Sequence, residues 1–436
     1  MSMRYVSLKA LQRSHSIPSE ESEGNWHTSL RKQDGPLLSL PSAVRMDPER
    51  VAQVLGGTAK TNPYGEYFSV RSWFAQPARY SPDSRALKLL VPDPIDEIAD
   101  PDQWLFLDTE TTGLSGGSGT YVFLVGVAWW EGGGLEIEQF FLREYSEERS
   151  LLLALRERIR QRPVLVTFNG KSFDWPLLET RYRMSRKVSV PTPRAHLDFL
   201  HPARNLWRLR LGSVRLSELE RHVLAWDRGA DLLSGMIPQI YFDYLRGGSP
   251  ERLVPVLNHN QMDLRGLVAL SSRILSLLSD AETLGQDGLE LFGVSRICEK
   301  RGENTRARKL YEKSISSILP TETDRMARRS LAKLAKREGD YDLACELWKD
   351  AAGNSRHGYE AYEQLAIYYE HKARDPESAL EVTRQAIGEL SNALQTGEIA
   401  PGAYRELKMK FDRRLERLAR KSRRPLLDAL GIEAQA

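Results

Sequence analysis

The sequence predicts an α/β domain, in which helices flank a mixed β-sheet, followed by an all-α domain of helical repeats. The α/β domain is predicted because apolar runs of strand length alternate with helical patterns between residues 91 and 282. The repeats are predicted because strand patterns stop near Leu284 and similar helical segments then recur. The 436 residues suffice for about three domains.

The composition is that of a globular protein. Hydrophobic residues form 41% of the chain and charged residues 28%, and the net charge of +3 excludes a polycation, so any basic surface must be local. Cys298 and Cys345 are too few for a disulfide framework or a four-cysteine zinc site and favour a reducing compartment. With no secretory signal or membrane-span pattern, we expect a cytoplasmic protein without a membrane partner.

The first 90 residues carry the weakest patterns. Residues 1–50 are polar and predict a flexible leader. In residues 51–90, glycines separate short apolar runs, which predicts a small region with one or two strands leading into the next domain.

The elements of the α/β domain, residues 91–282, follow from hydrophobic periodicity. Three strands come first, and a helix, a short buried strand and further helices follow. The expected strands are 103–107, 121–130, 135–142 and 164–168. The expected helices include 150–161, 175–182 and 255–279, of which the last is the clearest.

Helical repeats are expected over residues 285–400. Ala307, Ala344 and Ala379 stand in matched contexts, 37 and 35 residues apart. Tyr311 and Trp348 follow the first two alanines by one helical turn, on the same helix face. These segments resemble tetratricopeptide repeats, whose period is about 34 residues. An irregular helical bundle is the alternative.

Residues 401–436 predict a basic C-terminal helix and tail. Leu407, Phe411, Leu415 and Leu418 fall at helical spacing among many Lys and Arg residues, and Pro425 is expected to end the helix. Its cations could contact phosphate groups, or they could form the solvated face of a helix that packs on the last repeat.

Two carboxylates end the first predicted strand. Asp108 and Glu110 lie two residues apart, so they share one face of the strand. Carboxylates held close together repel each other unless a cation lies between them, and oxygen ligands suit Mg²⁺ or Mn²⁺. The alternative is a solvent-facing strand end with two unrelated acids.

Two further segments place acids in comparable positions. Asp174 follows the buried strand 164–168 and could cap the next helix or reach a metal ion. His259 and Asp263 are four residues apart and face the same side of a predicted helix. An isolated pair of this kind could equally be a surface pair.

Together these segments resemble the DEDD superfamily of 3′-to-5′ exonucleases, which have the ribonuclease H-like fold. That superfamily carries Asp-x-Glu in its first motif, Asn-x2-3-(Phe/Tyr)-Asp in its second, and His or Tyr before a final Asp in its third. The matching residues are Asp108 and Glu110, then Asn169, Phe173 and Asp174, and then His259 and Asp263.

A closer resemblance is to the bacterial YprB-type ribonuclease H-like proteins. It is carried by LFLDTETTGLSGGSGTYVFLVGV, VTFNGKSFDWPLLETRY and VLNHNQMDLRGLVAL, and it covers about residues 105–270. In some members a tetratricopeptide-like region follows. In one departure, three residues separate His259 from Asp263, whereas DEDD members with a histidine have four, which leaves the position of His259 relative to the metal ions open.

The resemblance implies a two-metal mechanism. The four acids, Asp108, Glu110, Asp174 and Asp263, would hold two Mg²⁺ or Mn²⁺ ions about 3.5 to 4 Å apart. His259 would orient or deprotonate the attacking water.

Candidate substrate-binding residues flank these motifs. Thr111, Thr112 and Gly113 follow the first motif, where the resemblance implies an approach to the terminal nucleotide, and Asn169 and Phe173 belong to the second. The glycine-rich stretch after Thr112 lacks the lysine of a phosphate-binding P-loop, so we do not expect a nucleoside triphosphate there.

A basic segment with an aromatic residue lies between the second and third motifs. Arg204 and Arg208 could contact phosphates, and Trp207 could stack on a base. Alternatively, arginines of this segment pair with Glu218 and Glu220.

The implied function is a metal-dependent nuclease, most simply a 3′-to-5′ exonuclease, with repeats that bind a protein partner. One alternative is a catalytically inert adaptor that binds through the repeats and basic tail, and another is a structure-selective endonuclease. The sequence does not distinguish DNA from RNA, because recognition of the 2′-hydroxyl depends on the detailed shape of the pocket.

Overall fold

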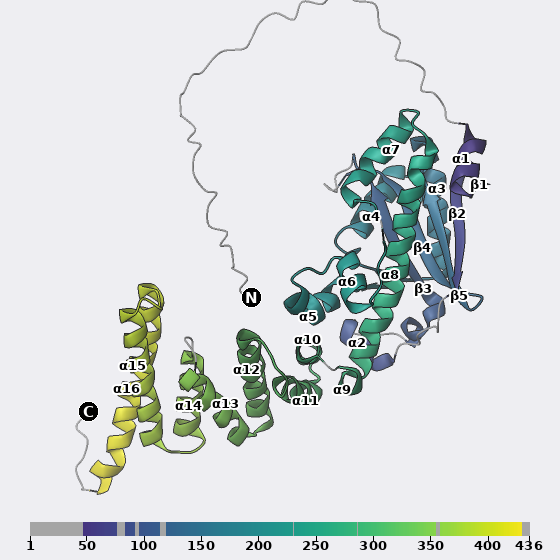
Figure 1. The fold of residues 1–436 in the computed structure, drawn as a ribbon. Coiled ribbons are helices and arrows are strands. Elements are labelled where there is room, and N and C mark those ends of the chain that lie inside the picture. Colours follow the sequence, from purple (N-terminus) through teal and green to yellow (C-terminus); the bar gives the residue numbers. More distant parts are fainter. Residues whose placement is uncertain are drawn as a thin grey trace, which may run out of the picture. The chain divides into compact units, whose positions relative to one another are not determined.

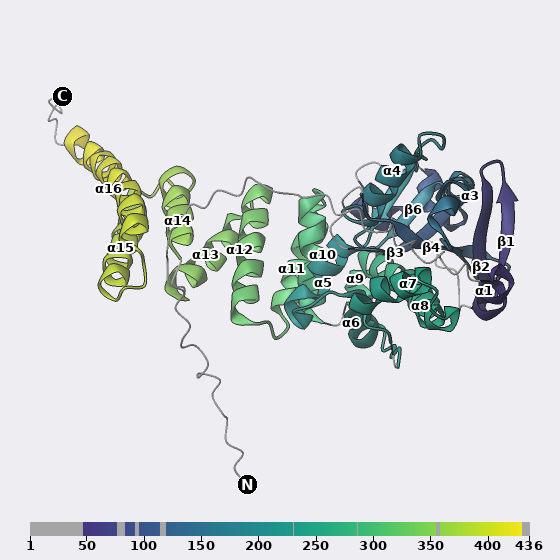
Figure 2. The same ribbon diagram turned by 90° about the horizontal axis from the view of Figure 1, so that it is seen from above.

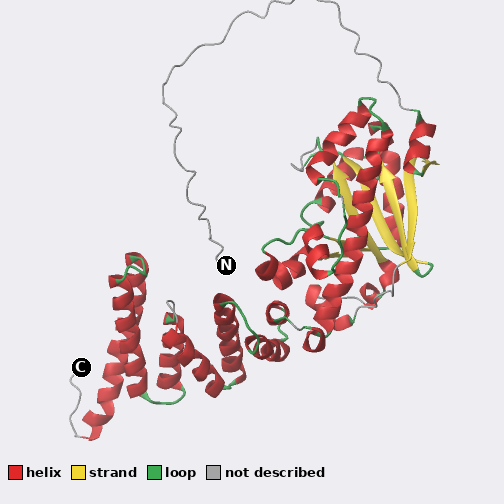
Figure 3. Cartoon of the chain, viewed as in Figure 1, coloured by secondary structure: helices red, strands yellow, loops and turns green. Residues whose placement is uncertain are grey.

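The computed structural model describes residues 47–75, 83–91, 96–113, 119–229, 231–285, 287–354 and 358–429. Most of the predicted leader lies outside these ranges. The described part begins with an α/β domain and continues as helices only (Figure 3), which confirms the predicted fold class. None of its helices combines the length and apolarity needed to cross a membrane.

A mixed sheet of seven strands forms the centre of the α/β domain, in the order β1-β2-β5-β4-β3-β6-β7. Strands β3, β6 and β7 run parallel, whereas the other neighbours are antiparallel. Gly132 and Gly133 form the two-residue turn from β4 to β5, with φ of 60° and 77° that residues with side chains rarely adopt. The strands are β1 (Gly57–Asn62), β2 (Gly65–Ala75), β3 (Trp104–Thr111), β4 (Val122–Glu131), β5 (Gly134–Phe141), β6 (Val164–Thr167) and β7 (Ala195–Asp198).

The strands predicted within residues 51–90 belong to this same sheet. The hairpin of β1 and β2 extends it, because β2 pairs antiparallel with β5 from Phe68 to Ala75. The pairing covers an edge of β5 that would otherwise expose unpaired backbone groups. The region predicted to lead into the α/β domain therefore supplies two strands to the sheet of that domain.

Helices cover both faces of the sheet, because side chains alternate along each strand. Phe106 and Ala128 pack against α2, α5 and α8, whereas Leu105 and Val127 contribute to the opposite core with α3, α4 and α7. Helix α8 runs along the sheet over β3 and β4 (Figure 1). The helices of the domain are α1 (Pro48–Leu55), α2 (Ser84–Leu90), α3 (Glu148–Gln161), α4 (Asp174–Ser185), α5 (Leu200–Leu211), α6 (Leu216–Val223), α7 (Ile237–Leu245), α8 (Val254–Ser279) and α9 (Ala281–Leu284).

The all-helical region packs each helix against the next along the chain (Figure 2). Ala307, Ala344 and Ala379 are fully buried in α11, α13 and α15, so the matched alanines occupy equivalent packing positions. The tetratricopeptide assignment itself stays a prediction. The helices are α10 (Gly288–Lys300), α11 (Asn304–Ile315), α12 (Thr321–Glu338), α13 (Tyr341–Asn354), α14 (Tyr359–His371), α15 (Pro376–Gln395) and α16 (Pro401–Ala429).

Helix α16 continues beyond Pro425 to Ala429, so the expected end at that proline is wrong. A proline removes one donor from a helix and disturbs the preceding turn, yet the helix can resume on its other side.

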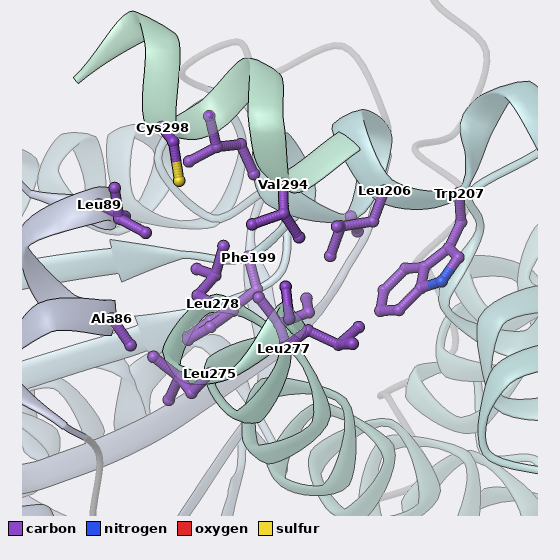
Figure 4. Packing of buried hydrophobic residues seen from close by; sticks show 14 of the residues in the cluster. Ala86, Leu89, Phe199, Leu206, Trp207, Leu275, Leu277, Leu278, Val294 and Cys298 are labelled. Carbon is purple, nitrogen blue, oxygen red and sulfur yellow. The ribbon is translucent and has the colours of Figure 1, made fainter. Parts of the chain in front are cut away.

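Helix α10 shares a hydrophobic core with the α/β domain (Figure 4). Leu206 of α5, Leu278 of α8 and Val294 of α10 belong to one cluster of buried residues. Gly293 allows α10 to approach α5 closely, because a Cβ at this position would lie 2.5 Å from the backbone oxygen of Asn205. The first helix of the all-helical region is thereby packed directly on the domain.

Candidate active site

Asp108 and Glu110 lie near the carboxyl end of β3, on the face that α8 covers. The buried run Trp104–Leu107 fixes β3 in the centre of the sheet. Thr109, between the two acids, points to the other face and is buried. Strand alternation therefore brings the two carboxylates to one place, as the sequence predicted.

Asp174 joins them from the loop after β6. It is the first residue of α4, and its buried carboxylate accepts a hydrogen bond of 2.5 Å from the Thr109 hydroxyl. Asp174 also lies near enough to raise the pKa of Asp108 and of Glu110, which favours the site interpretation over the helix-cap alternative.

Helix α8 supplies the third motif from above the sheet. One ligand atom from each of Glu110, His259 and Asp263 lies within 4.8 Å of the others. Between them on the helix, Asn260 donates from Nδ2 to Asp108 Oδ2 at 2.8 Å. Gly126 of β4 makes room for this helix, because a Cβ there would lie 2.1 Å from Asn260 Oδ1.

The electrostatics of the four acids favour a bound cation. Burial and the neighbouring carboxylates raise the pKa of Asp108 and of Glu110 well above their ordinary values. Burial also raises the pKa of Asp174 to about 6, against the hydrogen bond from Thr109. A divalent cation would relieve this repulsion, and a set of carboxylate oxygens fits Mg²⁺ or Mn²⁺.

His259 is held by an acid that the sequence analysis did not single out. Its Nδ1 lies 2.8 Å from Asp231 Oδ1, and its Nε2 lies 3.5 Å from Asp263 Oδ2. Burial acts to raise the pKa of Asp231, but hydrogen bonds from His259 and Arg228 outweigh it and lower that pKa. An ionised Asp231 favours the proton on Nδ1, which leaves a lone pair on Nε2, 3.5 Å from the Ser234 hydroxyl.

A buried arginine connects these acids. Arg228 donates to Asp263 Oδ1 at 2.5 Å, to Asp231 Oδ2 at 3.0 Å and to Glu220 Oε1 at 2.6 Å. Glu220 is completely buried, and Gly266 of α8 leaves the space that it fills. The segment from Trp226 to Asp231 has no periodic pattern, so no sequence signal pointed to Arg228 or Asp231.

The predicted substrate-binding residues after the first motif form hydrogen bonds with the backbone of the loop that follows β3. Thr111 Oγ1 donates to the Gly113 carbonyl at 2.9 Å, and Thr112 Oγ1 accepts from the Tyr121 N–H at 2.9 Å. Residues 114–118 of the glycine-rich stretch lie outside the described residues.

The second-motif residues Asn169 and Phe173 flank the loop that leads to Asp174. Asn169 has a left-handed backbone with φ of 70°, and its N–H donates to Asp198 Oδ1 at 2.9 Å. Phe173 is half-buried. The Phe173 N–H donates to the Asn169 carbonyl at 3.1 Å, so the two residues close the turn that leads into Asp174.

The basic segment between the motifs corresponds to α5. Arg204 and Arg208 are exposed, whereas Trp207 is fully buried and donates from Nε1 to Glu290 Oε1 at 2.7 Å. Its ring has no free face, so the expectation that Trp207 stacks on a base is wrong. The alternative pairing also differs, because Glu218 pairs with His222 and Glu220 with Arg228.

Comparison with known proteins places this site in a family. Residues 105–275, which include all five predicted catalytic residues, match the RNase_H superfamily. The uncharacterized protein YprB of Bacillus subtilis (strain 168) is 31% identical over 287 residues, which are 65% of this chain and 69% of that protein. The chain belongs to the YprB family.

The fold of this YprB-family protein has a partial counterpart among solved structures. A family B DNA polymerase from Pyrobaculum calidifontis matches with a TM-score of 0.34 and 16% identity. The match covers 48% of this chain and only 28% of the polymerase, so we draw nothing from it about activity. The ribonuclease H superfamily domain remains the basis for the functional argument.

Proposed function

We propose that this protein is a metal-dependent 3′-to-5′ exonuclease that acts on nucleic acid. The observation that carries the proposal is the cluster of acids at the end of β3. Glu110, Asp263 and His259 form one group, and Asp174 and Asp263 lie near enough to raise the pKa of Asp108. These residues meet near the carboxyl ends of two adjacent parallel strands, where ligand sites of such sheets commonly form.

The same four acids would hold two Mg²⁺ or Mn²⁺ ions. When bound, such ions supply Lewis-acid stabilisation of developing negative charge and a more acidic water. The raised pKa values of Asp108 and Glu110 support this assignment, because each carboxylate gains from a nearby cation.

His259 would act as the base. Its Nε2 faces Asp263 and would take the proton of the attacking water. The Asp231 carboxylate, 2.8 Å from Nδ1, would orient the ring and stabilise the positive charge that it gains. Arg228 would keep Asp231 in place through the hydrogen bond to its second oxygen.

The test incubates the purified protein with single-stranded DNA and RNA, labelled at either end, with Mn²⁺, Mg²⁺ or EDTA. We expect metal-dependent shortening from the 3′ end that is abolished in Asp108→Ala and Asp174→Ala. Asp342→Ala, which removes an exposed acid at the start of α13, is the matched control and should keep full activity.

The outcomes separate the proposal from its rivals. Cleavage of circular single strands would indicate an endonuclease on the same fold. Binding without cleavage would favour an adaptor that uses its helical repeats, which we expect to bind a protein partner. Full activity in Asp108→Ala would contradict the assignment of the site.

A further inference from the structure

An open groove of about 950 Å³ lies beside the α/β domain, where α5 faces α10 and α12. Seven cationic and two acidic side chains line it. The domain contributes Lys171, the end of α10 contributes Arg296, Lys300 and Arg301, and α12 contributes Arg329, Lys333 and Arg337. The groove thus concentrates positive charge in a chain whose net charge is only +3.

Much of this charge is not neutralised by the protein. Among the described residues, no carboxylate lies within 4.0 Å of the charged groups of Lys171, Arg296, Lys300 or Arg337, and all four are exposed. By contrast, Arg329 and Lys333 share Glu360. Unpaired cations facing one groove repel one another, and a polyanion would relieve that repulsion.

The two acids of the groove are engaged by neutral donors. Glu299 accepts a hydrogen bond from the Tyr311 hydroxyl at 2.7 Å, and Asp198 accepts from the N–H groups of Asn169 and Lys171. Burial and the nearby Lys171 lower the pKa of His196 to about 4, so this histidine is neutral at physiological pH. The charge of the groove therefore comes from its lysines and arginines.

The groove adjoins the candidate active site. Lys171 lies three residues before Asp174 in the loop after β6, and Asp198 anchors that loop from the end of β7. Asp198 is near enough to Asp174 to contribute to its raised pKa. A strand whose end reaches Asp174 would therefore find the groove next to it.

We propose that this groove binds the phosphodiester backbone of the nucleic-acid strand whose end is in the active site. The inference rests on the proposed function and assigns its substrate a second contact surface. The aromatic residues of the groove, Phe292 and Tyr311, are fully buried and offer no face to a base. Binding in the groove is therefore independent of base sequence and strongly dependent on salt.

The test compares two triple variants in the Asp108→Ala background, which prevents cleavage. Arg296→Gln, Lys300→Gln and Arg337→Gln together remove three unpaired cations of the groove. Lys309→Gln, Lys349→Gln and Arg384→Gln remove three exposed cations from α11, α13 and α15 and serve as the matched control. Fluorescence anisotropy measures the affinity of each for a labelled oligothymidylate in EDTA over a series of salt concentrations.

We expect the groove triple to lose affinity by about tenfold or more, and its slope of log K against log salt to fall by about 2, since each phosphate contact contributes about 0.7 for single strands. The control triple should match its parent. The proposal would be overturned if both triple variants kept the affinity and salt slope of the Asp108→Ala parent. It would also be overturned if both lost affinity equally. So would binding of polyglutamate as tight as that of an oligonucleotide of equal charge, which would assign the groove to an acidic protein.

The result is independent of the test for hydrolysis. Loss of binding in the groove triple while the wild-type protein cleaves nothing would support the groove and contradict the nuclease. Cleavage by the wild-type protein, together with unchanged binding by the groove triple, would support the nuclease and contradict the groove.

Discussion

Asp231 contacts Nδ1 of His259, whereas Asp263 lies near Nε2. A substitution that replaces one oxygen of Asp231 by nitrogen tests the first of these contacts. Asp231→Asn keeps the shape of the side chain but removes its charge. If His259 is the base, we expect the catalytic rate to fall by about 10–100-fold, the usual effect of removing the partner of an active-site histidine.

Steady-state kinetics measure the loss. Asp227→Asn is the control, because its exposed carboxylate accepts only from the Gly229 N–H among the residues that the structure describes. A loss of the same size in Asp227→Asn would mean that the substitution acts only through the structure of this loop.

Gly266 allows a test of how tightly α8 packs around the buried Glu220. A Cβ there would lie 1.6 Å from Oε1 of the buried Glu220, which holds Arg228. Gly266→Ala should therefore displace Glu220 and lower the free energy of unfolding by about 1–3 kcal/mol. Gly388→Ala in α15 is the contrasting variant, since nothing lies near its Cβ and alanine favours helix by about 0.5–1 kcal/mol. Thermal unfolding measures the stability of both variants. A Gly266→Ala protein as stable as wild type would contradict the close packing of Gly266 against Glu220.

The candidate catalytic residues could be predicted from the sequence because they stand in recognisable local patterns. Asp108, Glu110 and Asp174 follow buried strands, and His259 and Asp263 share one face of a helix, so local spacing sufficed. Arg228 and Asp231 lie in a segment without periodicity, and their roles come from contacts with α8 that are distant in sequence. Trp207 was placed wrongly because a tryptophan among arginines has the same local pattern whether it faces solvent or a neighbouring helix.

Helices α5 and α10 meet at Trp207, and substitution there separates a packing role from a role in substrate binding. Trp207→Phe keeps most of the ring but removes the Nε1–H donor to Glu290 Oε1, a hydrogen bond to a buried charged group whose loss costs about 1–3 kcal/mol. Arg273 still donates to the other oxygen of Glu290. Trp207→Ala should cost about 3–5 kcal/mol. Urea unfolding measures both, and stability equal to wild type with weaker binding of nucleic acid would restore the stacking role.

Strand pairing limited what could be predicted about elements. The strands from Trp104 to Phe141 were expected because the first two are nearly continuous apolar runs and the third alternates apolar and polar residues. The pairing of β2 with β5 joins segments about 70 residues apart, and only the tertiary structure determines which edge a hairpin covers. The same holds for α10, whose contact with α5 depends on Gly293 and on neighbours far away in the sequence.

The folding stability of the whole molecule should depend on pH through its cluster of acids when metal is absent. The pKa of Asp174 is raised to about 6 in the folded chain, above the value of about 3.9 for an unfolded aspartate. A carboxyl group of this kind binds its proton more tightly when folded, so it opposes folding once it is ionised. In EDTA, Asp174→Asn should therefore be more stable than wild type at neutral pH.

That difference should shrink as the pH falls through about 6 and vanish below about 4. Melting temperatures of both proteins in EDTA across this range measure it, with the exposed Asp342→Asn as the control that shows no such trend. A wild-type protein that is the more stable one at neutral pH would contradict the repulsion inferred among the acids.

Helix α8 carries His259 and Asp263 near its beginning and Leu275 and Leu278 near its end, where they join the core shared with α10. Each residue of an α-helix adds a rotation of about 100°. One residue inserted between Asp263 and Leu275 would therefore turn either the catalytic side chains away from β3 or the leucines away from α10. Across the family, chain length should vary in the loops around this helix but stay constant within that interval.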